Sequence, residues 1–388
     1  MRVLFLTHAY PRFADDPVGS FVLRLAVALR SRDIDVSVLA PAAEGLAEHD
    51  VFEGIAVRRF RYAPRALQTL AYTGTMSARA RESWGGRIAL AGLLASMLAA
   101  GTRLARRSHV DLVHAHWWFP SGLAGQGISR LAGAPLVTTS HGSDLRLARE
   151  VTGGQRLFRY IARRSAVLTT VSSWLARQAI ALDPSSTPVV APMPVISNLF
   201  HPGGQRDNAR VLFVGKLTEQ KGLQHLLRAL PLMQTRPTVD VVGAGRVDDA
   251  HLRMLAEELG VADRIRWLPI LSQAELAPLY RQAAVHVIPA IDEGLGLTAV
   301  ESLMSETPVV AFDSGGLPDV VIPEQTGLLV PPGDHGALGA ALDRLLEQPE
   351  EGARLGARGR QHVLARFGSD AVADQYAALY QRATTRSH

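Results

Sequence analysis

The chain has 388 residues, of which 47% are hydrophobic and 20% charged, a composition typical of folded rather than disordered protein. Its length predicts two domains of ordinary size. It contains no cysteine, which excludes disulfides, thiolate metal sites and thiol catalysis and fits a cytoplasmic location.

Charge is unevenly distributed along the chain, whose net charge is +5. Residues 1–200 hold 23 Arg against 13 Asp and Glu, whereas residues 201–388 hold 18 Lys and Arg against 23 Asp and Glu. A basic first half is suited to phosphate groups or anionic lipid headgroups. We expect no nucleic-acid partner, because the arginines are scattered and lack interleaved stacking aromatics.

The first half reads as short apolar strands that alternate with helices. The apolar run at the start, Met1–Tyr10, is too short to predict a secretory signal. A helical pattern covers residues 19–30. Strands are expected over residues 2–8, 35–41, 111–117, 135–141 and 166–172. Nearly continuous apolar strands between helices predict a parallel sheet that is covered on both faces.

One helical segment in this half, Ile88–Thr102, is predominantly apolar over 15 residues and lies between Arg87 and Arg103. A membrane span needs about 20 mostly apolar residues. We therefore interpret the segment as a packed helix of the first domain, with shallow membrane contact as the alternative.

The strand and helix pattern restarts after a Gly- and Pro-rich segment, residues 197–210, which we interpret as a linker. Strands are expected over residues 210–215, 238–244, 264–269, 284–289, 308–313 and 327–332. Helices are expected over residues 223–232, 249–259 and 273–281, and over 337–383 with breaks near Gln348 and Phe367. The fold class is therefore α/β, with two doubly wound, Rossmann-like domains over residues 1–200 and 201–370. Ligands in such sheets bind beyond the carboxyl ends of the strands, and two sets of strand ends could face one cleft.

Two lysines stand out, because Lys216 and Lys221 are the only lysines beside 39 arginines. Lys216 follows the predicted strand that ends at Gly215, and Lys221 precedes a predicted helix. An anion at this turn would meet two ammonium groups and the positive end of a helix dipole. The alternative is a pair of solvated lysines on a surface loop.

Two carboxylates, Glu293 and Glu301, lie eight residues apart after another predicted strand. Gly294 and Gly296 leave the loop backbone bare, and Thr298 is expected to cap the helix that carries Glu301. Backbone N–H groups at a helix N-terminus bind phosphate, and carboxylates accept hydrogen bonds from sugar or ribose hydroxyls. The alternative is a polar loop followed by an exposed helical glutamate.

Two weaker signals follow other predicted strands. Gly243 and Gly245 form a G-x-G that lacks the rest of a dinucleotide-binding fingerprint. In the first half, His141 could contact a reacting group and Asp144 could hold a hydroxyl. A purely structural histidine is the alternative.

Taken together, these segments resemble the retaining glycosyltransferases of family 4, which have the GT-B fold. The E-x7-E spacing of Glu293 and Glu301 is a weak pattern alone, but it occurs here among further motifs in the family's order. The motifs are residues 111–118, 141–144, 214–223, 241–269, 293–301, 308–321 and 327–334. The resemblance covers nearly the whole chain.

The resemblance implies a role for each donor-side residue. Lys216 and Lys221 would neutralise the donor diphosphate, although the family often has arginine where Lys216 stands. Glu293 would hold hydroxyls of the transferred sugar, and Glu301 would hold the ribose hydroxyls. The donor would also contact the backbone at Gly215, Gly243, Gly245, Leu268, Gly294, Leu295, Gly296, Leu297 and Thr298.

On the acceptor side, the resemblance implies that His141 faces the sugar from the opposite domain, with Asp144 near it. The loop that contains Gly19 and Ser20 would close over the acceptor. The family often has paired glycines at that loop, and it usually has a small residue and glycine where Glu306 and its neighbours stand. The last helix, residues 371–388, would cross back to the first domain.

The implied function is a retaining hexosyltransferase that moves a sugar from a nucleotide-diphosphate sugar to a hydroxyl of a glycan, a lipid-linked sugar or a small molecule, as in polysaccharide, glycolipid or glycoside biosynthesis. A UDP-sugar is the expected donor, with GDP- and ADP-sugars as alternatives. Because the lysines would stabilise the leaving diphosphate, no metal and no cofactor is expected.

We also expect the protein in the cytoplasm, with peripheral contact to the inner face of an anionic membrane. A sugar-nucleotide epimerase of the same fold and a non-catalytic sugar-nucleotide-binding homologue remain alternatives. A pyridoxal-phosphate phosphorylase is disfavoured, because both lysines lie at the phosphate turn and none remains for a Schiff base.

Overall fold

The computed structural model describes residues 1–14, 16–72, 76, 79–80, 83–244 and 249–385. The chain divides into a first unit, Met1–Pro194 with Ser369–His388, and a second unit, Val195–Gly368. The boundaries lie slightly before the expected positions 200 and 370. The reason is local: the Val195 N–H donates to the Phe367 carbonyl (3.0 Å), and the Phe200 ring packs on Tyr280, so both residues belong to the second unit.

The first unit contains a sheet in the order β3-β4-β2-β1-β5-β6-β7-β8, in which β3 is antiparallel to β4 and the other pairs are parallel. Its strands are β1 Arg2–Leu6, β2 Asp35–Pro41, β3 His49–Phe52, β4 Ile55–Phe60, β5 Leu112–His116, β6 Leu136–Ser140, β7 Val167–Thr170 and β8 Val189–Val190. Strands β5, β6 and β7 are buried at every residue, because helices cover both faces of the sheet.

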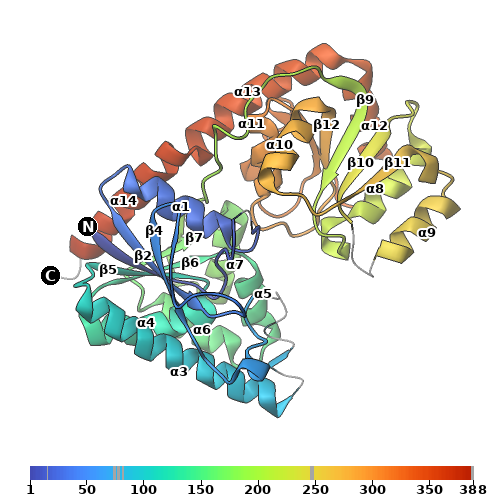
Figure 1. The fold of residues 1–388 in the computed structure, drawn as a ribbon. Helices are drawn as coiled ribbons and strands as arrows, with labels where there is room; N and C mark the ends of the chain where they lie inside the picture. Colours follow the sequence, from blue (N-terminus) through green and yellow to red (C-terminus); the bar gives the residue numbers. More distant parts are fainter. Residues whose placement is uncertain (15, 73–75, 77–78, 81–82, 245–248, 386–388) are drawn as a thin grey trace. The chain divides into compact units, whose positions relative to one another are not determined.

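Helices α1 and α14 lie on one face of this sheet, and α3 and α4 lie on the other (Figure 1). The helices are α1 Ser20–Arg30, α3 Trp84–Arg107, α4 Leu123–Ala132, α5 Ser143–Glu150, α6 Gly154–Ala162, α7 Ser173–Leu182 and α14 Ser369–Thr385. The last helix of the chain therefore completes the first unit.

The second unit has a parallel sheet in the order β11-β10-β9-β12-β13-β14. Its strands are β9 Asp207–Val214, β10 Thr238–Ala244, β11 Ile265–Pro269, β12 Ala283–Ile288, β13 Val309–Phe312 and β14 Gly327–Val330. Helices α8, α9 and α12 cover one face, and α10, α11 and α13 cover the other (Figure 1). The helices are α8 Leu223–Ala229, α9 Ala250–Glu258, α10 Gln273–Gln282, α11 Leu297–Met304, α12 His335–Glu347 and α13 Pro349–Phe367.

Each sheet has one point at which the strand order reverses. In the first unit the order reverses at β1, which pairs with β2 and β5, and in the second unit it reverses at β9, which pairs with β10 and β12. The loops that leave adjacent strands diverge at such a point and leave room for a ligand. The residues after β1, β5 and β6, and those after β9, β12 and β13, are thus the first places to look for chemistry.

Most expected elements are present, and two differences are instructive. The hairpin of β3 and β4 was missed, because the edge strand β3 (HDVF) is only four residues long and has no continuous apolar run. The expected linker over residues 197–210 is partly wrong, since β9 begins at Asp207, which pairs with Ala283 of β12. Pairing with a neighbouring strand extends β9 beyond its apolar residues.

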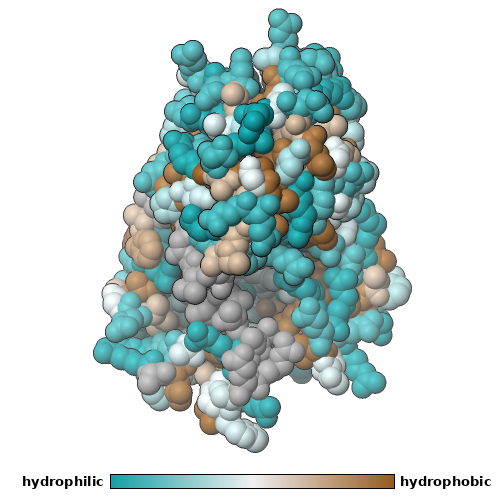
Figure 2. Space-filling view, turned by 90° about the vertical axis from the view of Figure 1, so that its right-hand side faces the viewer, coloured by the Kyte–Doolittle hydropathy of each residue, from teal (hydrophilic) through white to brown (hydrophobic). Residues whose placement is uncertain are grey.

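On the face of the molecule drawn in Figure 2, hydrophobic side chains occur in small groups between hydrophilic ones, as is usual for protein surfaces. Within the described residues, one helix, α3, is long and apolar enough to cross a membrane by length and composition alone. The helix covers 24 residues, Trp84–Arg107, and is therefore longer than the expected 15-residue segment Ile88–Thr102.

Candidate active site

The lysine turn and the Glu293 loop lie side by side at the carboxyl ends of β9 and β12. The Nζ of Lys221 lies 2.6 Å from Oε2 of Glu293, and both side chains are partly buried. The Ile291 N–H donates to the Gln220 carbonyl at 2.9 Å, and the Gln220 amide donates to the Asp292 carbonyl at 3.0 Å. Lys221 is therefore held by its neighbours, which excludes the alternative of a freely solvated lysine for this residue.

The glycine after Lys221 is what allows the two loops to approach so closely. Gly222 has a φ of 77°, and a Cβ there would lie 1.8 Å from the Pro289 carbonyl oxygen at the end of β12. An L side chain would have to displace that backbone. Gly222 thus places Lys221 beside Glu293.

A third loop, after β13, fixes the backbone of Glu293. The Gly316 N–H donates to the Glu293 carbonyl (2.7 Å), and the Asp292 N–H donates to the Ser314 hydroxyl (2.9 Å). Gly315 has a φ of 63°, and a Cβ on it would lie 2.2 Å from the Glu293 carbonyl oxygen. Because β9, β12 and β13 are adjacent in the sheet, the loops after three neighbouring strands meet at Glu293.

Lys216 differs from Lys221 in its surroundings. It is exposed at the first residue after Gly215, and its carbonyl accepts from the Thr218 N–H at 2.8 Å in a tight turn. Among the described residues, no acidic side chain forms an ion pair with Lys216. Its ammonium group is consequently available to a ligand.

Glu301 is buried within α11, so the alternative of an exposed helical glutamate is wrong. Its residue is 6% exposed, and its carboxylate accepts hydrogen bonds from the Tyr280 hydroxyl (3.0 Å) and the Gln273 amide (3.2 Å). Burial raises the pKa of Glu301 to about 7, against the opposing effect of those two hydrogen bonds. The same burial raises the pKa of Tyr280 well above its ordinary range, which keeps this hydroxyl a donor.

The expected cap of α11 is wrong. The helix begins at Leu297, its N-cap is Gly296 with a φ of 89°, and no side chain caps it, so Thr298 lies within the first turn. The loop turns through Gly296 in a left-handed conformation, so the N-cap lies two residues before the expected Thr298. Its first N–H groups therefore lack a side-chain acceptor, and Gly294 and Leu295 lead directly into them.

The glycine turn after β10 lies against the start of the lysine turn. The Gly215 N–H donates to the Val242 carbonyl (3.1 Å), and a Cβ on Gly243 would lie 2.0 Å from the Gly215 carbonyl oxygen. Gly245 lies outside the described residues. Leu268 is half-buried and pairs with Val242 in the register of β10 and β11, so its backbone lies at the neighbouring strand end.

In the first unit, the half-buried His141 packs against a group of aromatic and imidazole rings. The Nε2 of His141 lies 3.2 Å from Nδ1 of His116, and its ring lies 4.6 Å from the Trp117 ring between centroids. Burial, with neighbouring imidazoles, holds the pKa of His141 and His116 well below the ordinary range. Both rings are therefore neutral near pH 7, and His141 is suited to hydrogen bonding rather than to carrying charge.

His114 ties this group to the end of the chain. Its Nδ1 lies 2.7 Å from the Tyr380 hydroxyl of α14, and its Nε2 lies 2.7 Å from the Thr139 hydroxyl of β6. Burial lowers the pKa of His114 to about 3, so it too is neutral. No role was predicted from the sequence for His114, His116 or Tyr380.

Asp144 supports the loop that carries His141. Its carboxylate is buried and accepts the backbone N–H groups of His141 (3.1 Å), Gly142 (3.0 Å) and Trp118 (3.1 Å). Burial raises the pKa of Asp144 against these hydrogen bonds. Because its carboxylate accepts from the backbone N–H groups of His141 and Gly142, Asp144 orients the loop that carries His141.

The expected acceptor loop lies before α1. Gly19 has a φ of 72° and is the N-cap of the helix, where a Cβ would lie 2.3 Å from the Ala9 carbonyl oxygen. Ser20 begins the helix, and its hydroxyl donates to the Pro17 carbonyl at 3.2 Å. The two ends of the loop between β1 and α1 are therefore in contact, at Ala9 and Gly19.

Several residues that contact these loops or Glu301 were given no role from the sequence. They are Gln220, Gln273, Tyr280, Ser314, Gly315 and Gly316. The paired glycines at 315 and 316 were the one signal available, since such a pair marks a backbone that something approaches closely. Within the described residues, no group of three or more His, Asp or Glu side chains is arranged to hold a metal ion.

Comparisons with known families and structures identify the family to which this chain belongs. A model described as "Glycosyl transferase 4-like domain" matches residues 18–193, and one described as "Glycosyl transferases group 1" matches residues 198–362. The "MMP alpha-(1->4)-mannosyltransferase" of Mycolicibacterium hassiacum is 33% identical over 314 residues, 75% of each chain. A "D-inositol 3-phosphate glycosyltransferase" of Thermobispora bispora is 34% identical over 341 residues, 78% of each chain.

Solved structures share the fold along the whole chain. A sucrose-phosphate synthase from Thermosynechococcus elongatus superposes with a TM-score of 0.83, covering 99% of each chain at 22% identity. Anabaena HepE in complex with UDP-glucose gives a TM-score of 0.73, covering 98% of this chain and 99% of its own at 19% identity.

The charged residues after the strands of the second unit and the neutral histidines after those of the first belong to a two-domain nucleotide-sugar enzyme of GT-B fold. The chain is a member of glycosyltransferase family 4. It is a glycosyltransferase that takes its sugar from a nucleotide sugar, and the similarity favours this activity over an epimerase or a non-catalytic homologue.

Proposed function

We propose that the protein is a retaining hexosyltransferase that uses a UDP-sugar, with GDP- and ADP-sugars as the alternatives to be tested. The choice of UDP is supported by HepE, a protein of the same fold whose structure contains UDP-glucose. The observation that carries the proposal is the convergence of Lys221 and Glu293 at 2.6 Å on adjacent strand ends.

Lys216 and Lys221 bind the donor diphosphate in this proposal. Breaking the bond between sugar and phosphate builds negative charge on the leaving diphosphate. The two ammonium groups stabilise that charge as it forms, and the uncapped N–H groups at the start of α11 add to them. Because the protein itself supplies this positive charge, the proposal includes no metal and no cofactor.

The Lys221–Glu293 ion pair links the two parts of the donor site in this proposal. Each group compensates the charge of the other, which limits the free-energy cost of holding both partly buried. When the diphosphate takes the Lys221 ammonium, the Glu293 carboxylate becomes free to accept from hydroxyls of the transferred sugar. Donor binding and sugar binding are thereby linked through one ion pair.

Glu301 accepts the ribose hydroxyls, and the backbone at Leu268, Gly215 and Gly243 lines the nucleotide. Gly245 is proposed with them from the sequence alone. The Tyr280 and Gln273 hydrogen bonds hold the Glu301 carboxylate in one orientation. That fixed orientation suits a pair of vicinal hydroxyls, which require two acceptor oxygens at a set spacing.

On the acceptor side, we propose that the neutral ring of His141 hydrogen-bonds to the substrate, with Asp144 as its positioning residue. Gly19 and Ser20 shape the acceptor loop. The acceptor is a hydroxyl of a glycan, a lipid-linked sugar or a small molecule. Two features favour an anionic acceptor or a membrane-held one in the cytoplasm: the basic residues 1–200, and a relative named for inositol phosphate.

A donor screen tests this proposal. UDP-, GDP- and ADP-sugars are compared by thermal shift and by slow hydrolysis of the donor in the absence of acceptor. One nucleotide class should raise the melting temperature and be hydrolysed with retention at the anomeric carbon. If none of the three classes shifts the melting temperature, or if the released sugar is inverted, the proposal is wrong.

A further inference from the structure

Helix α3 lies flat along the first unit and is anchored there by one face. Ala89, Leu93, Met97 and Ala105 are buried in the hydrophobic core. Two glycines bring the helix close to the rest of the unit: a Cβ on Gly92 would lie 2.2 Å from the Tyr62 carbonyl oxygen, and one on Gly101 would lie 2.3 Å from Ile128 Cδ1. Although α3 is apolar enough to cross a membrane, this packing makes it a part of the domain rather than a span.

The opposite face of α3 is apolar and exposed. Trp84 is 77% exposed and Ile88 is 63% exposed, and Ala91, Ala95 and Ala99 continue the stripe at intervals of three and four residues. Only 28% of the apolar window of this helix is buried within the unit. The exposed stripe is therefore unlike the outer face of an ordinary surface helix, which carries charged and polar residues.

Every charged residue on α3 is an arginine. They are Arg87, Arg103, Arg106 and Arg107. Residues 84–110 contain no Asp or Glu, and among the described residues no carboxylate forms an ion pair with any of the four. The Arg87 guanidinium lies over the Trp84 ring, 4.9 Å from its centroid. The stripe thus combines exposed apolar side chains with uncompensated positive charge at both ends.

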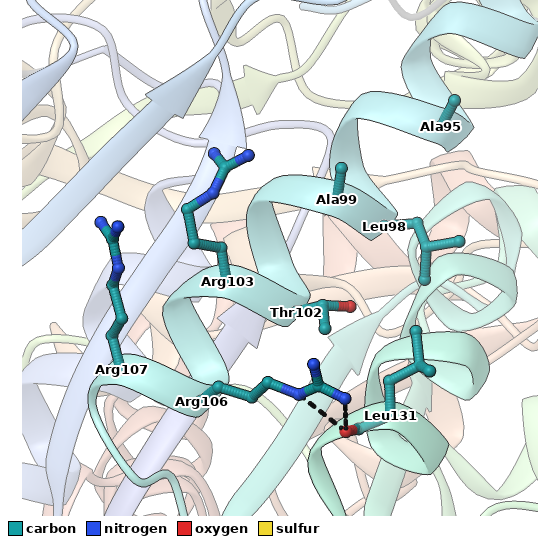
Figure 3. Close-up of a pocket in the computed structure, with 8 residues that line it drawn as sticks. All are labelled: Ala95, Leu98, Ala99, Thr102, Arg103, Arg106, Arg107 and Leu131. Carbon is teal, nitrogen blue, oxygen red and sulfur yellow. Dashed lines mark hydrogen bonds between the residues drawn. The ribbon is translucent and has the colours of Figure 1, made fainter.

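A hollow of about 540 Å³ lies where the carboxyl-terminal half of α3 meets the end of α4 (Figure 3). Its apolar lining includes Leu98, Ala99 and Leu131, and Arg106 crosses its edge to bond the Leu131 carbonyl (2.8 and 3.0 Å). Arg103 and Arg107 extend from the same turns of the helix without a partner in the drawn group (Figure 3). The hollow thus has an apolar floor and arginine side chains at its edge.

We propose that this α3 face, defined as Trp84, Arg87, Ile88, Ala91, Ala95, Ala99, Arg103, Arg106 and Arg107, docks on an anionic lipid bilayer with the helix parallel to the membrane surface. Trp84 and Ile88 would enter the headgroup region, where tryptophan is favoured. The arginines would reach lipid phosphates, each contributing through the negative surface potential. This inference does not depend on the identity of the donor.

Charge decides against a second copy of the chain or another protein as the occupant. In a symmetric dimer through this face, arginines would meet a surface that has no carboxylate to pair with them. Short alanine side chains also offer little of the anchoring contact area that protein interfaces use. A bilayer, by contrast, needs only shallow apolar insertion and supplies the negative charge.

The test is co-sedimentation of the full chain with vesicles at low salt. We expect binding to vesicles that contain phosphatidylglycerol and none to pure phosphatidylcholine. Arg103→Glu/Arg107→Glu should weaken binding by about 30-fold or more, since each basic residue near the surface contributes several-fold. The matched control, Arg156→Glu/Arg177→Glu, changes the net charge equally at two exposed arginines on α6 and α7 and should keep most of the binding.

Further measurements separate the alternatives. Trp84→Ala should reduce binding that persists at high salt, and hydrolysis of the nucleotide sugar in solution should be unchanged in all of these variants. Equal loss in the test and control pairs would show a non-specific effect of net charge and overturn the proposal, as would absence of binding to the anionic vesicles. A change of oligomeric state in Arg103→Glu/Arg107→Glu, measured by analytical ultracentrifugation, would assign the face to a protein contact instead.

Discussion

The strand ends of the two units occupy equivalent places in two similar sheets but use opposite chemistry. In the second unit, Lys216, Lys221 and Glu293 are charged and partly exposed, and glycines at three loops bring them together. In the first unit, His116 and His141 are neutral, and the carboxylate of Asp144 beside them is bound by backbone N–H groups.

This difference shows that the position of a ligand site and the kind of ligand that it binds are determined by separate features. The reversal of strand order determines where a ligand can bind in either sheet. The residues that follow the strands determine what can bind: paired charges suit a dianionic donor, whereas neutral imidazoles suit hydroxyls. The variants below test whether charge carries the function in the second unit and hydrogen bonding carries it in the first.

The largest effect is expected from the lysines. Lys216→Ala and Lys221→Ala should each lower kcat by about 100- to 1000-fold, because each removes a charge that stabilises the leaving diphosphate. Rates are measured by release of the nucleotide, and folding is checked by thermal melting. Arg228→Ala, which removes a positive charge from exposed α8, is the matched control. Near-normal rates in both lysine variants would refute the phosphate assignment.

Gly315→Ala should be nearly as damaging without removing any functional group. A Cβ at this position would displace the Glu293 backbone, so we expect about 100-fold slower transfer and a loss of about 2–4 kcal/mol in the free energy of unfolding. Denaturant titration measures the second quantity. Gly333→Ala is the control, since it has a comparable φ of 81° but no atom within 4 Å, and should cost only about 1 kcal/mol. Equal effects in the two variants would mean that backbone strain, not the approach to Glu293, explains the loss.

Glu301→Gln should weaken donor binding by roughly 10-fold while raising stability at alkaline pH. Between its ordinary value of 4.5 and its folded pKa of about 7, the folded protein keeps a proton on Glu301 that the unfolded chain has lost. Stability therefore falls as pH rises through this window and stays lower above it.

The variant has no such proton, so at pH 8 its melting temperature should be higher than that of the wild type, and its free energy of unfolding should be larger by at most about 3 kcal/mol. Below the ordinary value of 4.5 the two proteins should be equally stable. Glu258→Gln, on the exposed side of α9, should show no such pH dependence. A constant difference between wild type and Glu301→Gln across this range would contradict the raised pKa.

The smallest effect concerns His116. Because its contact with His141 is one hydrogen bond between neutral rings, His116→Leu should slow transfer by about 5-fold, with little change in donor affinity. The same substitution in a His141→Ala background should have no further effect on the rate. If the two losses instead multiply, His116 acts on the reaction by some route other than His141.

Much of the fold follows from the sequence, since period and length determine strands and helices locally. The predicted bounds of β2 and β10 agree with the structure, because each is an apolar run that ends at Pro41 or a glycine turn. The edge strand β3 and the first residues of β9 were missed, because they are strands by pairing with a neighbour and have no apolar pattern of their own.

The site residues were easier to nominate than to place. Lys221 and Glu293 were singled out by rarity and by spacing, but their ion pair joins loops 72 residues apart, which no local pattern reveals. The burial of Glu301 depends on Tyr280, which lies on a different helix and became visible only in three dimensions. Thr298 was predicted as the cap of α11 from its residue type alone. In the structure the N-cap is Gly296, in a left-handed conformation that the sequence did not reveal.

The chain enters the second unit at Val195 and returns to the first unit at Ser369. The ribosome therefore releases the whole second unit before the residues that complete the first one. Until α14 emerges, His114 lacks the Tyr380 hydroxyl, and Tyr376 cannot fill its place in the core. During synthesis the second unit can fold by itself as soon as its last strand and helices are made, whereas the first must wait with its central histidines incompletely bonded. Removal of α14 is therefore expected to disturb His114 and the rings packed on it rather than the lysine turn. This holds although Lys216 and Lys221 are closer to α14 in the sequence than the histidines are.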